Sequence, residues 1–96
     1  DDIVNAFISA VKKYNNFNGV IQLGPNHSTS IAEIAERIVN ISGKNISIKY
    51  DKSKPEGDLD RMANNNKAKK ILDWSPKTSL DEGLRNVFNW CKTKLL

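Results

Sequence analysis

Apolar residues recur every three or four positions in three parts of the chain, the spacing that gathers them on one face of an α-helix. The first part covers residues 2–14, and the second begins after Ser30 and stops at Gly43, where glycine suits a left-handed helix cap. A short helix is predicted over residues 67–73, and a final one from residue 80 to 95. The chain is therefore predicted to form four helices, three of them with a clear apolar face.

Polar residues mark where these helices begin and end. Residues 30–33 and 79–82 both read Ser-x-x-Glu, the capping box in which hydroxyl and carboxylate each satisfy an amide at the helix start. Asn64 to Asn66 provide caps for the short helix, and Pro76 prevents its continuation. The helix starts are thus the best-defined points of the pattern.

Two short segments have the pattern of β-strands instead. Residues 20–23 are mostly apolar and lie between turn formers, and residues 46–50 alternate with period two. Because a helix connects them, the two strands are predicted to lie side by side and parallel. The fold class expected is α/β, a single small lobe over residues 1–96 with four helices and two strands. A sheet of two strands is thin for independent folding, so both would gain from pairing with structure that this chain does not contain.

Length and composition fit one soluble globular domain. The chain has 96 residues, 39% of them hydrophobic and 27% charged, enough for one modest core. No apolar run approaches the roughly 18 residues that span a bilayer, and no secretory leader is present. The single cysteine excludes an internal disulfide and favours a reducing compartment, so a cytoplasmic location is predicted. The Asp-Asp start leads straight into a helix and looks like the start of an excised domain.

The net charge of +4 raises the question of nucleic-acid binding. Nearly all of the excess lies in residues 51–96, where ten basic side chains face seven acidic ones. The one basic cluster, Lys67 with Lys69 and Lys70, is flanked by acidic residues, and no basic stripe interleaved with aromatics appears. Neither a nucleic acid nor a membrane is therefore expected as a partner.

Two residue types that are common in metal and nucleophile sites, histidine and cysteine, occur only once each. His27 is the only histidine and Cys91 the only cysteine, so a metal site with three or four ligands is not expected. The glycines form no G-x-G-x-x-G or Walker pattern, so no residue here is predicted to bind a dinucleotide. The acidic pairs near the helix starts are explained by capping, and no catalytic residue is predicted. Trp74 and Trp90 are predicted to anchor the core.

Arg61 is the strongest candidate for a binding residue. It follows a loop with Pro55 and Gly57, and backbone constraint on both sides would let its planar guanidinium present two charge-assisted bonds to a diphosphate. Lys54 at the entrance of the loop would add a point charge. The alternative is a solvated surface arginine paired with a neighbouring aspartate, and on the residues alone this alternative is favoured.

The order of motifs in the second half of the chain resembles a known family. The motifs are Lys-Pro-Glu-Gly-Asp-Leu-Asp-Arg at residues 54–61, Leu-Asp-Trp-Ser-Pro at 72–76 and Ser-Leu-Asp-Glu-Gly-Leu at 79–84. They are similar to the last segment of the extended short-chain dehydrogenases/reductases that act on nucleotide sugars, with the loop closest to GDP-fucose synthases and GDP-mannose epimerases. Asp73 stands where that family carries a glycine.

The resemblance implies specific roles. In that family a loop arginine grips the diphosphate of the substrate, so Arg61, with Lys54, is expected to bind a nucleotide-diphosphate sugar. The family's NAD or NADP site lies in a Rossmann domain, and its catalytic Tyr-x-x-x-Lys lies elsewhere too. The chain would then be the C-terminal, substrate-binding portion of an epimerase, dehydratase or reductase, inactive alone, from a parent for which a homodimer is one arrangement. The alternative is a truncated, non-catalytic binding or protein-interaction module.

Overall fold

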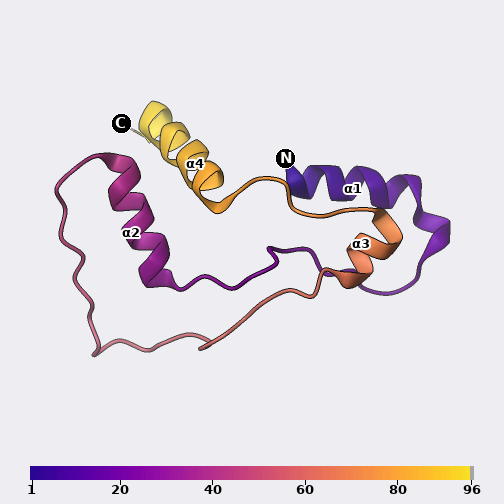
Figure 1. Ribbon diagram of the computed structural model, residues 1–96, viewed down its shortest axis with the longest axis horizontal. Coiled ribbons are helices and arrows are strands. Elements are labelled where there is room, and N and C mark those ends of the chain that lie inside the picture. The colour runs from indigo at the N-terminus through magenta and orange to yellow at the C-terminus, as the bar shows by residue number, and fades with distance from the viewer. Residues whose placement is uncertain (96) are drawn as a thin grey trace. The chain divides into compact units, whose positions relative to one another are not determined.

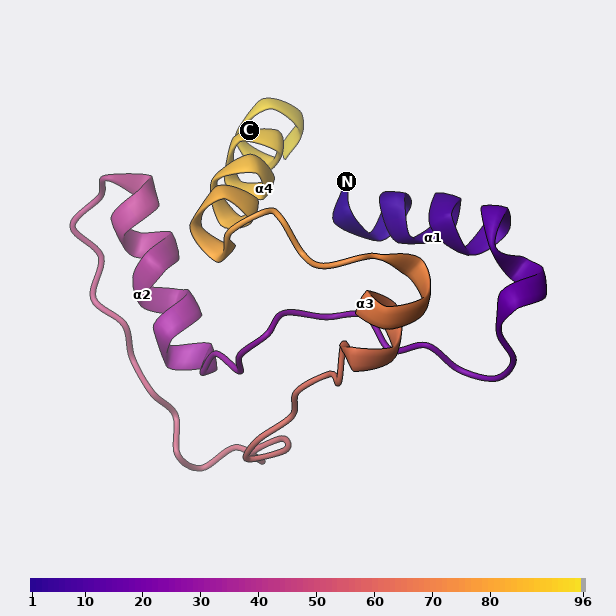
Figure 2. The same cartoon turned by 45° about the vertical axis from the view of Figure 1, so that its right-hand side comes forward.

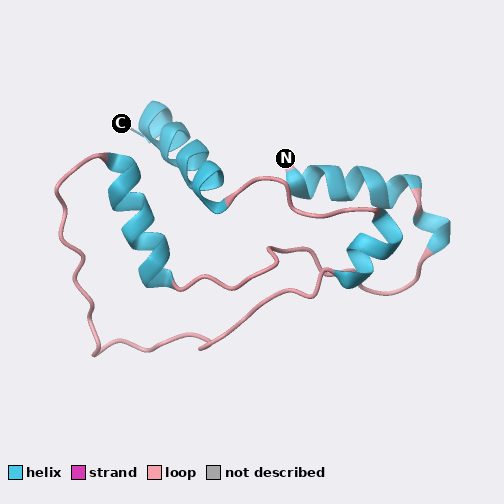
Figure 3. Ribbon diagram, in the orientation of Figure 1, coloured by secondary structure: helices cyan, strands magenta, loops and turns pink. Residues whose placement is uncertain are grey.

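The computed structural model of the protein describes residues 1–95, and its regular structure there is helical (Figures 1 and 3). The four predicted helices are confirmed in position and order. No helix among the described residues combines the length and apolar character that crossing a membrane requires. The elements are α1 (Asp2–Lys12), a 3₁₀ turn η1 (Tyr14–Asn16), α2 (Ile31–Ser42), α3 (Asn66–Leu72) and α4 (Leu80–Leu95).

The chain divides into two compact units. The first unit contains Asp1–Ser28 and Asp60–Thr78, and therefore helices α1 and α3. The second unit contains Thr29–Leu59 and the chain from Ser79 onward, and therefore α2 and α4. Each unit is thus assembled from two stretches that are distant in the sequence.

The predicted α/β class with two parallel strands is wrong, because no described residue is in a strand. Residues 20–23 and 46–50 are loops that belong to different units. In the first unit, backbone carbonyls at residues 18 and 20 bond to a side chain of α3 instead of to a neighbouring strand. The Lys67 ammonium donates to the carbonyls of Asn18 at 2.9 Å and Val20 at 3.1 Å. A period-two pattern shows which side chains are apolar, but a strand also needs a paired backbone.

The core of the first unit lies where α1 meets α3. Ala6 and Ala68 are fully covered, at 1% and 0% exposure, and their small side chains let the two helices approach closely. Leu72 and Trp74 complete the buried set. The Trp74 indole Nε1 donates a 2.7 Å hydrogen bond to the carbonyl of Asp2, which satisfies its buried polar atom. Trp74 is therefore a core anchor, as predicted.

Asp2 ties the start of α1 to the chain that follows Trp74. Its carboxylate accepts from the backbone amides of Lys77 at 3.0 Å and Thr78 at 2.9 Å. The bond from the Thr78 amide, followed by that from Lys77, lowers the pKa of the carboxyl below its ordinary value. The two ends of the first unit are thus joined at a single side chain.

Asp73, at the end of α3, is strained. Its φ of 50° puts it in the left-handed region, and it is the only non-glycine residue with positive φ among residues 1–95. This conformation lets the backbone amide of the next residue, Trp74, donate to the carbonyl of Ala68 at 3.3 Å and close the end of the helix, so it has a structural purpose. A glycine adopts this conformation without the steric cost that an L side chain incurs.

We expect Asp73→Gly to raise the free energy of unfolding by about 0.5–1 kcal/mol, the relieved strain less the entropy that a glycine adds to the unfolded chain. Urea denaturation followed by circular dichroism measures the change. Asp73→Ala is the matched control, since it removes the same carboxylate and keeps the strain. Equal stability of the two variants would show that the backbone conformation at this position costs nothing.

In the second unit, α2 packs on α4, and the two helices run in the same direction (Figure 2). Gly43 ends α2 in the left-handed conformation, with φ of 66°, as its position predicts. No described residue of this unit is fully buried. Trp90 is 58% exposed, so the prediction that it anchors the core is wrong. Its place off the main apolar stripe of α4 explains the difference, because α2 covers only that stripe.

Candidate functional site

The loop that carries Lys54 begins with a turn built by Asp51. The Asp51 carboxylate accepts from the Ser53 hydroxyl at 2.6 Å and from the Ser53 amide at 3.0 Å. These bonds, the hydroxyl first, lower the pKa of Asp51 below its ordinary value. The turn fixes the backbone just before Lys54, whose side chain is exposed.

The chain that follows Arg61 is anchored by polar side chains. The Asn64 amide donates to the Gln22 side-chain oxygen at 3.0 Å. The Asn65 side chain forms a two-way bridge to Gly24, accepting from its amide at 2.9 Å and donating to its carbonyl. The first residues of α3 are therefore fixed to the loop after residue 23, and Arg61 lies only three residues before this anchor.

Gly24 makes a second, steric contact with the same stretch. A Cβ atom at position 24 would lie 2.6 Å from the Cβ of Ala63, closer than two carbon atoms can pack. The glycine is needed because the two backbones approach so closely, and it positions the chain two residues after Arg61.

Sequence reasoning missed these anchors. Asn65 looked like an ordinary helix cap, but its side chain makes no cap hydrogen bond and turns to Gly24 instead. The cap is provided by Asn64, whose side-chain oxygen accepts from the Asn66 amide at 3.0 Å. A run of three asparagines signals caps in general, and nothing in the sequence says which one reaches across to another loop.

The two predicted binding residues fall in different units. Arg61 is exposed, belongs to the first unit and takes part in an interaction within the chain. Lys54 is exposed and belongs to the second unit. The structure does not bring them together within one unit, and their joint role stays a prediction.

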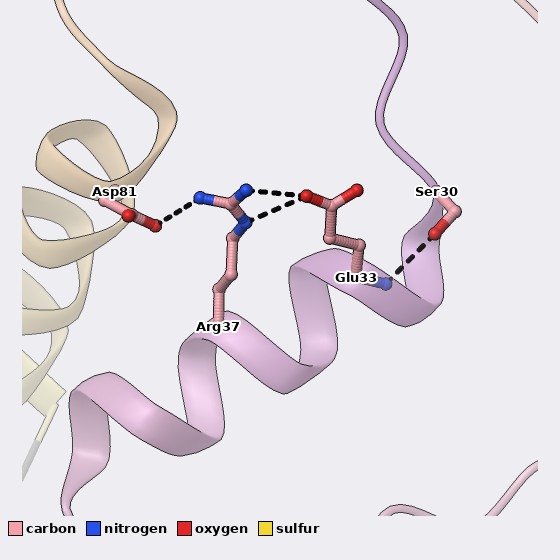
Figure 4. A network of polar contacts seen from close by, with 4 residues as sticks. All are labelled: Ser30, Glu33, Arg37 and Asp81. Atoms are coloured by element: carbon pink, nitrogen blue, oxygen red, sulfur yellow. Dashed lines mark hydrogen bonds and ion pairs between the residues drawn. The ribbon is translucent and has the colours of Figure 1, made fainter.

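Arg37 is the centre of the most extensive charge network, shown in Figure 4. Its guanidinium donates to the Asp81 carboxylate at 2.7 Å and to the Glu33 carboxylate at 2.6 Å and 3.2 Å. The hydrogen bonds that it donates, first to Asp81 and then to Glu33, raise the pKa of Arg37 above its ordinary value. Because the Arg37 side chain is 35% exposed and its two partners are 46% and 59% exposed, solvent screens both pairs and each contributes only modestly to stability. The network links α2 to the start of α4.

This network also changes the expected capping at residue 30. The Ser30 hydroxyl accepts from the Glu33 amide at 3.1 Å, but the Glu33 carboxylate bonds to Arg37 rather than turning back to the helix start (Figure 4). The capping box is therefore half formed. The missed signal was the i,i+4 spacing of Glu33 and Arg37, which favours such a pair on a helix.

Residues 1–95 contain no group of three or more histidine, cysteine, aspartate or glutamate side chains placed to hold a metal ion. His27 is exposed and Cys91 half-buried. The chemistry that the described side chains offer is thus charge and hydrogen bonding, with an exposed loop that carries both signs of charge before an anchored stretch of backbone.

Comparison with known proteins gives relatives of one kind. UDP-glucuronate 4-epimerase from Thermodesulfobacterium geofontis is 31% identical over 99% of this chain and 29% of its own length. GDP-mannose 3,5-epimerase from Arabidopsis thaliana is 30% identical over 99% of this chain and 24% of its own length. GDP-L-fucose synthase 1 from the same plant is 28% identical over 94% of this chain and 27% of its own length. No protein-family profile and no solved structure matches the chain.

These similarities define a class of proteins that act on nucleotide sugars. The chain belongs to the NAD-dependent nucleotide-sugar epimerase family of short-chain dehydrogenases/reductases. It spans about a quarter of the length of the curated relatives it matches. The family resemblance seen in the motifs is thereby confirmed.

Proposed function

We propose that the chain is the C-terminal, substrate-side lobe of a nucleotide-sugar epimerase, dehydratase or reductase. In this proposal the Arg61 guanidinium binds the diphosphate of the sugar nucleotide, and Lys54 adds a second positive charge. A guanidinium forms two parallel hydrogen bonds to phosphate oxygens, and an ammonium acts as a point charge.

One observation carries this proposal: the backbone on the C-terminal side of Arg61 is fixed, while the loop before it is open. The bonds of Asn64 and Asn65 to Gln22 and Gly24 hold the following residues in place. On the other side, residues 51–60 are all exposed, so the loop is accessible to a ligand. A binding arginine needs a fixed backbone and an accessible guanidinium, and this arrangement supplies both.

The proposal includes NAD or NADP in the parent protein, but no step is assigned to this chain through that cofactor. The residues present do not fit a dinucleotide, because the chain has no glycine-rich phosphate loop. What the chain contributes is binding and orientation of the substrate. We place the parent in the cytoplasm, in keeping with the single cysteine.

The dinucleotide-binding domain of the parent is also the proposed partner of the first unit. The apolar face of α1 is open, with Phe7 66% and Val11 72% exposed. Nearby, Ala6, Ala10, Phe17 and Ile21 contribute to a groove of about 180 Å³. The backbone of residues 21–23 has no hydrogen-bond partner among the described residues. An exposed helix face beside unpaired backbone suits the edge of a sheet in another domain.

Replacement of Arg61 in the full-length parent tests the diphosphate role. We expect Arg61→Ala to lower kcat/KM for the sugar nucleotide by roughly 10- to 150-fold, which corresponds to about 1.5–3 kcal/mol for hydrogen bonds to a charged group. The same variant should bind the nucleoside diphosphate product less tightly and the monophosphate almost unchanged. Inhibition constants for GDP with GMP, and for UDP with UMP, measure this difference.

Arg85→Ala is the matched control, since Arg85 is an exposed arginine of α4 that lies outside the loop. It should leave kcat/KM unchanged. An Arg61→Ala enzyme with unchanged kcat/KM, or one that loses affinity equally for diphosphate and monophosphate, would remove Arg61 from the diphosphate site.

A further inference from the structure

Asn18 is the only asparagine in the chain that a glycine follows. The backbone amide of the residue after an asparagine can attack the asparagine side chain, and glycine hinders this attack least because it has no Cβ atom. Gly19 has a φ of 83°, in the left-handed region that L side chains rarely adopt, so the backbone itself favours glycine here. The reactive pair is therefore a consequence of the backbone conformation between η1 and residues 20–23.

Both reacting groups lack hydrogen-bond partners among residues 1–95. Neither the Gly19 amide nor the Asn18 side chain makes a hydrogen bond in this part of the chain. By contrast, the Asn65 side chain bonds to Gly24 through both its oxygen and its nitrogen. A side chain that is held elsewhere cannot turn back to the following amide, and an amide that donates to another group is a poor nucleophile. Asn18 and Gly19 have neither restriction.

The Lys67 ammonium lies at the same peptide bond. It donates to the Asn18 carbonyl at 2.9 Å, and this carbonyl belongs to the peptide group whose nitrogen is the Gly19 amide. A Cβ atom at position 19 would lie 3.7 Å from the Lys67 nitrogen, so the ammonium is close to residue 19 as well. When the amide loses its proton, its nitrogen and the carbonyl oxygen share the negative charge. A positive charge at that oxygen favours the anion, so Lys67 makes the Gly19 nitrogen a better nucleophile.

We propose that Asn18 is a site of spontaneous deamidation that Lys67 promotes. The Gly19 amide gives its proton to hydroxide, its nitrogen forms a bond to Cγ of Asn18, and the bond from Cγ to Nδ2 breaks. Nδ2 takes a proton from water and leaves as ammonia, which restores the hydroxide and leaves a cyclic succinimide. Water then opens the ring at one or the other carbonyl and yields aspartate or isoaspartate. The reaction needs neither substrate nor cofactor, so it stands independently of the proposed diphosphate role.

The same contact determines which product is favoured. Lys67 bonds to the main-chain carbonyl of Asn18, and a hydrogen bond to that oxygen favours attack of water on this carbonyl of the ring. Opening there gives isoaspartate, in which the backbone runs through the side-chain carbon atoms and is longer by one methylene group. The product therefore places a new carboxylate and a longer backbone beside Lys67, in the loop that this lysine fixes through Asn18 and Val20.

Storage of the full-length protein at mildly alkaline pH tests the proposal. Trypsin releases residues 14–37 as one peptide, which also contains Asn16 and Asn26 as internal references. We expect mass spectrometry to show the exchange of amide for carboxylate at Asn18 and not at these two asparagines. Enzymatic methylation of isoaspartate should show that it is the larger product.

Variants of Lys67 test its role. Lys67→Met should slow the loss of ammonia by about three- to tenfold, less than the roughly 100-fold or more for a donor in a closed active site, because solvent screens the charge. Lys67→Arg keeps the charge and a donor, so it should react at nearly the unchanged rate. Lys70→Met is the matched control, since Lys70 is an exposed lysine of the same helix that makes no hydrogen bond to residues 18–20.

Concentrated urea provides the reference for the unfolded chain. There Lys67 is no longer held at Asn18, so the difference in rate between the unchanged protein and Lys67→Met should vanish. Asn18 that stays intact in the folded protein while it reacts in urea would overturn the proposal, and so would a folded Lys67→Met variant that reacts as fast as the unchanged protein. Aspartate without isoaspartate would indicate direct hydrolysis of the side chain instead of attack by the Gly19 amide, and would also overturn it.

Discussion

Replacement of Trp74 by alanine is expected to unfold most of the first unit. The side chain is only 6% exposed, and its indole nitrogen bonds to the Asp2 carbonyl at 2.7 Å. Truncation of a buried tryptophan costs about 3–5 kcal/mol, which is most of the stability of a small domain. Urea denaturation monitored by circular dichroism should show loss of helical signal at lower denaturant concentration, or no folded baseline at all.

Two further variants test whether the loss of stability is specific to the buried position of Trp74. Trp90→Ala removes the same side chain from a position that is 58% exposed, so its cost should stay within about 0.5 kcal/mol. Trp74→Phe keeps most of the apolar area but loses the hydrogen bond to the Asp2 carbonyl, so we expect a smaller cost of about 0.5–1.5 kcal/mol, the net contribution of one hydrogen bond. Equal costs at positions 74 and 90 would contradict the described burial.

The two tryptophans show which features of the structure the sequence predicts and which features it does not. Helical periodicity located three helices and cap residues located the short one, because the apolar face and the caps of a helix lie within a few neighbouring residues. Whether an apolar residue is covered depends on a neighbour that is distant in the chain. The Asp2 carbonyl covers one side of Trp74 from 72 residues away, and α2 leaves Trp90 open.

The predicted strands were wrong for a related reason. Residues 20–23 have apolar side chains at suitable places, but no strand lies beside them in residues 1–95. Instead, Lys67 and Asn65 bond to the backbone at residues 18–24, through side chains that no periodicity reveals. Strand prediction from one sequence assumes a partner strand, and the part of the chain that the structure describes does not supply one.

The candidate site is a prediction from the motif, and the structure adds the contacts around it. The loop from Lys54 to Arg61 stood out because of its order of residues, and the chain that contains it belongs to the nucleotide-sugar epimerase family. The anchors that position the chain after Arg61 could not be predicted. They depend on Gln22 and Gly24, which are about forty residues earlier in the sequence.

Gly24→Ala is expected to disturb this anchor and to lower the free energy of unfolding by about 1–3 kcal/mol, the usual cost of overpacking. The added Cβ would lie 2.6 Å from that of Ala63, so one backbone has to move. The move would stretch the bridge between Asn65 and the backbone of residue 24 and shift the chain that carries Arg61. Urea denaturation measures the stability, and kcat/KM of the parent enzyme reports the shift at Arg61.

Ala63→Gly tests whether the clash with residue 63 is the reason that Gly24→Ala lowers the free energy of unfolding. Alone, it should cost up to about 1 kcal/mol, because a glycine adds entropy to the unfolded chain. Combined with Gly24→Ala, it removes the atom that clashes, so the double variant should be more stable than the sum of the two single effects by about 1 kcal/mol or more. Strict additivity would show that the two backbones can separate without cost. In that case the backbone that follows Arg61 would be held in place by the hydrogen bonds of Asn64 and Asn65 alone.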